Sequence, residues 1–586
     1  MKLTAPPSPS IGRRSGPGSA RLLSGLRAPN AGGDARATTP WSAWLGSALL
    51  ALSLLLANLP ARANVYATNL RLNGGFTNVT IAPGGSVNLS YILNEPATAG
   101  VTIEVLCGSA VVRTISVTSP NPGTTRGTNT LVWNGKDNSN NNLLAGTYSL
   151  RVTAAATGYT NWTQISNDSD PGNYVYQPTG LAVNKNPASR YYGRVFVANS
   201  GSGGSTGKLG DQVGILKLNA DGSFAGEGGF STGSYAWAGD AFSPWKMEVS
   251  ADDKLYVNDW TGNGIVLAFD QLVTSNNYLT VLRGDIGPSS SSADNNPTGA
   301  AVLSGPAITG AGTGTQIWMA DINQAGADGS GITRWGVTSN LICALNDLGT
   351  SIVPLSSDLN LYPYNVAVDN NNFIYTIQFV TVTNDPSPRV LRYAPYSGAP
   401  ETTANWKVGM NDNDRRGAVG LAVDPTATYV AVSFRAPFPS AADGSGGLVI
   451  LRALDGSLVK RDVAPLHDTP VVAWDNAGNV YAGDNAASFW RIYSPPGTNQ
   501  ASTVAVPAVQ VSGTPTRPVL SAPTRSGGQF QFTLSGQANV CYLIQASARP
   551  GPPWTTVATN LSASAVRTIT VSASGSQSFY QAVVGP

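Results

Sequence analysis

Histidine is almost absent from this sequence. Its 586 residues include one, His467, so a Ser-His-Asp triad, a Cys-His pair or a histidine-rich zinc or copper site has only this residue to use. His467 stands beside Asp468 just before an apolar segment, where a loop histidine without a chemical role is the simpler interpretation. The sequence therefore excludes most histidine-based catalysis and metal binding.

Cysteine is also scarce. The three cysteines, Cys107, Cys343 and Cys541, lie so far apart that each falls in a different one of the domains proposed below. This spacing indicates no disulfide framework, so stability is expected to come from core burial.

Charged residues make up only 12% of the chain, and lysine and glutamate are rare, whereas glycine, serine, threonine, asparagine and valine are frequent. Long solvated helices need many charged residues such as lysine and glutamate, whereas short strands joined by turns need valine, threonine, glycine, serine and asparagine. An all-β fold follows. Because 586 residues exceed what one hydrophobic core usually supports, several domains are expected.

Residues 1–63 have the pattern of a signal peptide. A basic leader precedes an apolar run at 41–57, and the Ala-Arg-Ala sequence at 61–63 has the small residues that a signal peptidase recognises. The alternative is a membrane anchor, but the apolar run is short and is interrupted by serine and glycine. We expect a secreted chain that begins near Asn64 and has no transmembrane span after cleavage.

Removal of this leader changes the charge of the chain. The leader holds seven of the 35 basic residues and one of the 33 acidic residues, which leaves 28 basic and 32 acidic residues. A net negative chain lacks the electrostatic basis for binding nucleic acid, so no such partner is expected.

A three-part phrase occurs six times between residues 178 and 494. Each copy has a short apolar strand, a second strand, and a third β-branched or aromatic segment. The second strands begin at residues 194, 254, 316, 373, 428 and 479. Self-similarity at this period, with three or four short strands per unit, is typical of a β-propeller, so six blades are predicted.

Regular alternation of apolar and polar residues between 65 and 158 predicts a β-sandwich ahead of the propeller. In this stretch, residues 133–137 (Trp-Asn-Gly-Lys-Asp) and 144–148 (Leu-Ala-Gly-Thr-Tyr) resemble the W-D-G-x-D…x-A-G-x-Y phrase of the FlgD-like Ig-like domain family. Asn134 replaces the usual aspartate. The resemblance implies an Ig-like sandwich at 64–160.

Residues 366–375 and 473–484 (Ala-Trp-Asp-Asn-Ala-Gly-Asn-Val-Tyr-Ala-Gly-Asp) are similar to the repeat phrase of NHL-type propellers. The resemblance implies a six-bladed propeller, NHL or TolB-like, at 161–511. We expect 161–178 to lend a strand that closes the ring and 503–511 to supply its last strand. The wider six-bladed family contains both enzymes and carbohydrate-recognising domains, so the fold does not fix the function.

The tail at 512–586 follows a proline-rich joint and alternates again. Residues 542–547, Trp554 and 579–580 are similar to the small C-terminal β-sandwich modules of secreted bacterial proteins. The resemblance implies a spacer or surface-attachment unit.

Polar residues stand at equivalent positions near the ends of the six second strands. They are Asn199, Asp259, Asp321, Gln378, Ser433 and Asp484. Rotation about the propeller axis places them in a ring on one face, where a ligand can bind. The three carboxylates of this ring, Asp259, Asp321 and Asp484, could together bind a Ca²⁺ ion. The alternative, which we favour, is that each residue supports its own turn. Apart from this Ca²⁺, no cofactor is expected.

Five tryptophans lie on or near loops and strand ends, where indole rings can stack on sugar faces. They are Trp237, Trp245, Trp260, Trp335 and Trp490. Propeller blades also bury aromatic rings between sheets, and that alternative accounts for most of them.

These features predict a secreted or cell-surface binding or adhesion protein, more often non-catalytic than enzymatic, whose propeller recognises a glycan or a surface protein. Two alternatives stay open. One is a cation-dependent propeller enzyme of the lactonase, phosphotriesterase-like or lyase kind, and the other is a purely structural surface component.

Overall fold

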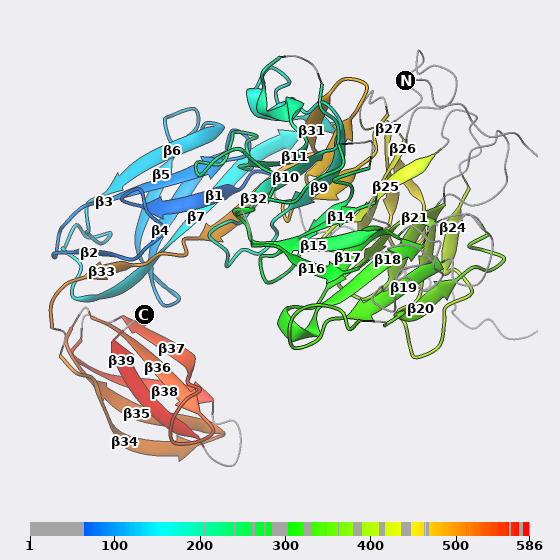
Figure 1. Cartoon of the computed structure of the whole chain (residues 1–586). Helices are drawn as coiled ribbons and strands as arrows, with labels where there is room; N and C mark the ends of the chain where they lie inside the picture. Colours follow the sequence, from blue (N-terminus) through cyan, green and yellow to red (C-terminus); the bar gives the residue numbers. More distant parts are fainter. Residues whose placement is uncertain are drawn as a thin grey trace, which may run out of the picture. The chain divides into compact units, whose positions relative to one another are not determined.

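The computed structural model describes residues 64–584 except 204–205, 240–241, 261–263, 275–276, 284–302, 322–330, 346, 361–362, 379–389, 410–416, 435–446, 462, 464–467, 515, 539, 562–563 and 573–577. The predicted signal peptide and His467 lie outside these residues. The described part is built of β-strands with three short 3-10 turns and no α-helix, as the composition predicts (Figure 1). None of its helical segments is long and apolar enough to cross a membrane.

The first domain is a sandwich of two sheets. One sheet has three strands, β1 (Ala67–Leu72), β3 (Val87–Leu93) and β6 (Gly127–Trp133). The other has six, β2 (Val79–Ile81), β33 (Val509–Val511), β7 (Gly146–Tyr159), β4 (Gly100–Cys107), β5 (Ala110–Val117) and β32 (Gly497–Val504).

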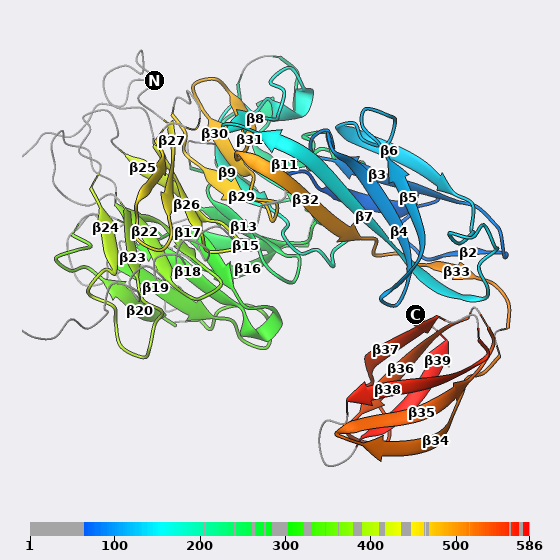
Figure 2. The ribbon, with the colours of Figure 1, turned by 180° about the vertical axis from the view of Figure 1, so that it is seen from behind.

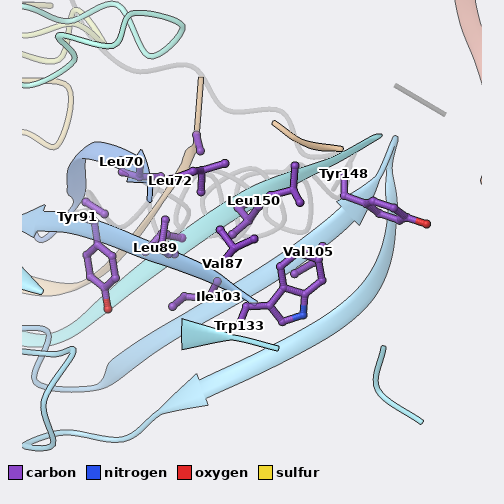
Figure 3. Close-up of a cluster of buried hydrophobic side chains, with 14 of the residues drawn as sticks. Leu70, Leu72, Val87, Leu89, Tyr91, Ile103, Val105, Trp133, Tyr148 and Leu150 are labelled. Atoms are coloured by element: carbon purple, nitrogen blue, oxygen red, sulfur yellow. The ribbon is translucent and has the colours of Figure 1, made fainter. Parts of the chain in front are cut away.

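The core of this sandwich lies between the two sheets (Figure 3). Val87 and Leu89 of β3 pack in one cluster with Ile103 of β4 and Leu150 of β7, and the indole of Trp133 belongs to the same core. The alternating residues of each strand supply this core because successive side chains point to opposite faces of a sheet.

The propeller is inserted into this sandwich. The chain leaves the sandwich through β7 and returns through β32, and the two strands pair antiparallel, with Tyr159 opposite Gly497 and Arg151 opposite Val504 (Figures 1 and 2). The prediction that 503–511 forms the last propeller strand is therefore wrong. Alternation identifies a strand but not its partner, and these residues pair with β7 and β2.

The propeller consists of six four-stranded antiparallel sheets, here blades 1 to 6. The inner strands are β9 (Pro178–Val183), β13 (Met247–Val249), β17 (Leu303–Thr309), β21 (Pro363–Val368), β25 (Ala418–Val423) and β29 (Val472–Trp474). The second strands are β10 (Val195–Asn199), β14 (Leu255–Asp259), β18 (Gln316–Asp321), β22 (Ile374–Gln378), β26 (Tyr429–Phe434) and β30 (Val480–Asp484).

The third strands are β11 (Gly214–Leu218), β15 (Ile265–Phe269), β19 (Gly331–Gly336), β23 (Val390–Tyr393), β27 (Gly447–Arg452) and β31 (Phe489–Ser494). The outer strands are β12 (Phe230–Ser231), β16 (Leu279–Leu282), β20 (Thr350–Pro354), β24 (Trp406–Val408), β28 (Leu458–Lys460) and β8 (Thr163–Gln164).

Strand β8 closes the ring. It precedes blade 1 in the chain but pairs with β31 of blade 6, which confirms the closing strand predicted within 161–178. Arg491 of β31 fixes this closure, because its guanidinium bonds Asp168 at 2.8 Å and Asp484 at 2.9 Å. The side chain of Asp484 is 1% exposed, so the carboxylate of this ion pair is shielded from water.

Buried polar side chains join the sandwich to blade 6. The hydroxyl of Tyr66 lies 3.4 Å from that of Tyr481, which donates to Asp475 at 3.1 Å. Burial raises the pKa of Asp475 to about 6. Nearby in the sandwich, burial raises the pKa of Glu95 to about 7, although the hydroxyl of Tyr159 donates to its carboxylate at 2.7 Å.

The C-terminal domain has two three-stranded sheets. They are β34 (Val519–Ser526), β35 (Gln529–Ser535) and β38 (Val566–Ser572), and β37 (Thr555–Leu561), β36 (Cys541–Ser547) and β39 (Phe579–Val584). Phe532 and Ile569 of the first sheet share a core with Tyr542 and Ile544 of the second.

A disulfide joins Cys107 of the first sandwich to Cys541 of the C-terminal domain, with the two Cα atoms 6.0 Å apart. The expectation that the cysteines indicate no disulfide is therefore wrong. The two residues are 434 positions apart, so only the tertiary fold brings them together. Cys343 is a buried free thiol.

Candidate functional site: the axial cavity of the propeller

The inner strand of each blade is an edge strand. Each of the six pairs on one side only within the described sheets, so the backbone N–H and C=O groups of its other edge face the propeller axis. These edges surround a cavity of about 590 Å³. Ligand sites for small molecules have volumes of about 300–1,000 Å³, so the cavity has the size of such a site.

The cavity opens at the turns that follow the inner strands. The exposed residues that line it, such as Pro187, Ala251, Gly310 and Asn372, all belong to these turns. At the opposite end the lining residues, such as Lys246, are buried. Among the described residues, the exposed part of the cavity lining therefore lies at these turns, which we call the mouth.

Asparagine and aspartate side chains around the mouth form hydrogen bonds between neighbouring blades. Each reaches the backbone of the next turn: Asn186 Nδ2 to Ala251 O (3.3 Å), Asp252 Oδ2 from Gly312 N (3.0 Å), Asn370 Nδ2 to Pro425 O (2.6 Å) and Asn476 Nδ2 to Lys185 O (2.5 Å). These bonds connect neighbouring blades at four of the six junctions between blades. They make the mouth a rigid frame, which lowers the ordering cost of ligand binding.

One charged residue interrupts the pattern of the inner strands. The central residue of the three-residue apolar core is alanine in five blades: Ala182, Ala307, Ala367, Ala422 and Ala473. In blade 2 it is Glu248, which lines the cavity and is partly buried. The exception is visible when the six copies are aligned, although no predicted site included Glu248.

Glu248 has one hydrogen bond. Its Oε2 accepts the backbone N–H of Ile308 in blade 3 at 3.0 Å, and none of the described residues donates to Oε1. Burial raises the pKa of Glu248, while the positive charge of Lys185 and the Ile308 N–H act in the opposite direction. Lys185 follows the inner strand of blade 1 and lines the same cavity.

A second lysine in the cavity is already engaged. The ammonium of Lys246 lies over the ring of Trp245, 4.1 Å from its centroid, and donates to the carbonyl of Pro470 in blade 6. It therefore lies at the end of the cavity away from the mouth.

Two further carboxylates line the cavity, and both are capped by their own turns. Asp369 accepts the N–H groups of Asn371 and Phe373 and the hydroxyl of Tyr375. Asp424 accepts bonds from residues 426, 428 and 429 in the same way. These aspartates hold turns.

The predicted ring on the second strands lies outside the cavity. All six side chains are buried, at 3% exposure or less: Asn199, Asp259, Asp321, Gln378, Ser433 and Asp484. Several have partners close by. Asn199 bonds Gly210 O and Gln177 N, and Asp259 accepts the hydroxyl of Tyr235 at 2.8 Å.

The three carboxylates of this ring do not come together. In the part of the chain that the structure describes, no group of three His, Cys, Asp or Glu side chains could hold a metal ion. A Ca²⁺ ion shared by Asp259, Asp321 and Asp484 has no geometric support there, because the second strands lie behind the inner strands as seen from the axis.

Three of the five tryptophans are core residues. Trp245, Trp335 and Trp490 are at most 2% exposed, and their indole N–H groups donate to Ser304 Oγ, Asp347 O and Gly172 O. They cannot offer a face to a sugar, and for these three residues the structure shows the burial that the sequence favours for most of the five. Trp237 and Trp260 are partly exposed.

Trp260 belongs to an aromatic cluster at the strand ends opposite the mouth. Its ring lies 5.3 Å from that of Trp245 and 4.2 Å from that of Phe242, and Tyr364 packs at 5.6 Å. The cluster adds packing at these strand ends.

Comparison with known proteins finds one family match and a similar solved structure. Residues 77–158 match the family model of the FlgD Ig-like domain. This match identifies the first sandwich. The crystal structure of the WD40 β-propeller domain of Doa1 is similar at a TM-score of 0.33 and 11% identity, over 58% of this chain and 97% of that one. No curated protein matches the chain.

Proposed function

We propose that this chain is a secreted, non-catalytic binding protein whose axial cavity takes a polar, hydroxyl-rich ligand such as the end of a glycan chain. The observation that carries the proposal is the wall of the cavity. Six open strand edges present backbone donors and acceptors, and a carboxylate stands among them. Buried polar groups need hydrogen-bonding partners, and the hydroxyl groups of a sugar both donate and accept.

Secretion has two supports. The pattern of residues 1–63 is that of a signal peptide. The disulfide between Cys107 and Cys541 is typical of proteins in an oxidising compartment.

The cavity suits binding better than hydrolysis. Cleavage of a glycosidic bond generally uses two carboxyl groups, one on either side of the bond. Among the described carboxylates that line the cavity, Asp369 and Asp424 are held by their own turns, which leaves Glu248 open to a ligand. The raised pKa of Glu248 is the one feature that favours the enzyme alternative, since a general acid needs such a group.

A glycan array probed with the full chain tests the proposal. We expect one or more glycans to be retained, and mass spectrometry of the bound glycan after prolonged incubation should show it intact. A matched pair of variants locates the site. Pro187→Trp places a large ring at the mouth and should abolish retention, whereas Ala188→Trp, on the exposed residue next to it outside the cavity lining, should not.

Two results would contradict the proposal. If no glycan is retained, the cavity does not serve this class of ligand. If the bound glycan is cleaved, the protein is an enzyme.

A further inference from the structure

We propose that Glu248 and Lys185 form a recognition pair that binds two neighbouring hydroxyl groups of a neutral sugar, with the carboxylate as acceptor and the ammonium as donor. This inference rests on the proposed function and names the residues and the ligand chemistry of the same cavity.

The fold does not need Glu248. Alanine fills the equivalent position of the other five inner strands, so a small apolar side chain satisfies the packing of this strand. A partly buried carboxylate is costly unless hydrogen bonds compensate for lost water, and Glu248 has one such bond. Removal of a costly group that packing does not require should leave the fold intact, which marks Glu248 as a binding residue.

The carboxylate has acceptor capacity left for a ligand. Ionised glutamate can accept about four hydrogen bonds, and the Ile308 N–H uses one of them, on Oε2. That bond also fixes the orientation of the side chain, because it ties blade 2 to blade 3. A ligand in the cavity therefore meets a carboxylate already held in place.

Lys185 supplies the complementary donor. It lines the cavity from blade 1, on the opposite side of the blade 2 inner strand from Ile308, and its charge already acts on Glu248. Lys246 is less suited to this part, since its ammonium is bound to Pro470 O and stacked on Trp245.

The charges of the pair favour a neutral ligand. One negative and one positive group cancel, so neither an anion nor a cation gains from the pair as a whole. Adjacent hydroxyl groups of a pyranose fit it: one donates to Glu248 while the next accepts from Lys185. Hydrogen bonds to charged groups are roughly twice as strong as those between neutral groups, so the pair can fix the position of the sugar.

The test uses the full chain and three probes, the methyl glycosides of glucose, mannose and galactose, measured by isothermal titration calorimetry. We expect at least one to bind. Glu248→Gln should weaken that binding about tenfold or more, because the amide presents a donor where the sugar hydroxyl needs an acceptor. Lys185→Met should weaken it by a similar factor. Glu401→Gln, a partly exposed glutamate outside the cavity lining, is the matched control and should change nothing.

Glu248→Ala guards against a folding artefact, since it installs the residue found in the other five blades. It should fold and melt near the temperature of the parent, because loss of the bond to Ile308 offsets removal of the partly buried carboxylate, and it should not bind the glycoside. If a glycoside binds and both Glu248 variants bind it as the parent does, the ligand lies elsewhere and the recognition pair is wrong, while the proposed function stands. If none of the three glycosides binds while the array retains a glycan, the recognition pair is wrong and the proposed function stands; if the array retains no glycan either, the proposed function fails.

Discussion

Replacement of Glu95 by glutamine should change how the stability of the protein depends on pH. Glu95 is 1% exposed and lies in the first sandwich, where burial raises its pKa from 4.5 to about 7. When folding raises the pKa of an acid, its contribution to stability is complete at pH values below the pKa of the unfolded state. This contribution to the free energy of unfolding is lost as the pH rises through the pKa of the folded state.

The magnitude follows from the two pKa values. Each pKa unit corresponds to about 1.4 kcal/mol, so the rise from 4.5 to about 7 makes the ionised Glu95 cost about 3 kcal/mol. The free energy of unfolding of the parent should therefore fall by about this amount between pH 4.5 and pH 7 through this group alone. Asp475, with a pKa of about 6, also lowers the free energy of unfolding as the pH rises.

Glu95→Gln keeps an acceptor for the Tyr159 hydroxyl but cannot ionise. Urea unfolding of parent and variant, measured at several pH values from 4 to 8 by tryptophan fluorescence, should show curves that diverge as the pH rises, with the variant gaining about 3 kcal/mol relative to the parent. Parallel curves would show that Glu95 has an ordinary pKa and would refute the reasoning.

Two further predictions concern the closure of the ring and the route of the chain out of the cell. Arg491→Ala removes the cationic partner of the buried Asp484, whose Oδ1 also accepts the N–H of Ala487, so it should cost up to about 3–5 kcal/mol; a melting temperature close to that of the parent would show that β8 closes the ring without this ion pair. Intact-mass measurement on secreted protein should give a chain that begins near Asn64, and non-reducing peptide mapping of the same sample should link Cys107 to Cys541; a full-length form without this link would contradict secretion.

The sequence was informative wherever a local pattern repeats. The apolar strands recur six times with short turns between them, and that repetition predicted the six sheets, because each blade is one local unit. The closing strand before blade 1 was also predicted, since a propeller needs a partner for its last sheet.

Pairings between distant segments were not predictable from local patterns. Strands β32 and β33 alternate like any half-buried strand, and only the fold shows that they complete the first sandwich. The disulfide between Cys107 and Cys541 likewise joins distant segments, and no local pattern in the sequence indicates it. A propeller fragment should accordingly end near residue 494, where the strand β31 ends.

The ring of second-strand residues, for which the sequence favours local turn roles, lies away from the axial cavity for a geometric reason. Rotation relates the ends of the second strands, but it does not bring them together, because the inner strands stand between them and the axis. The side chains that reach the axis come from the inner strands. Glu248 was visible there as the exception among five alanines, and only the cavity gives that exception a meaning.

The central claim is that the ligand binds in the axial cavity. A crystal structure of the full chain with a glycan selected on the array tests it most directly. The account predicts a sugar inside the ring of inner strands, within hydrogen-bonding distance of Glu248. A sugar bound on the outer strands or on either sandwich, with the cavity empty, would contradict it.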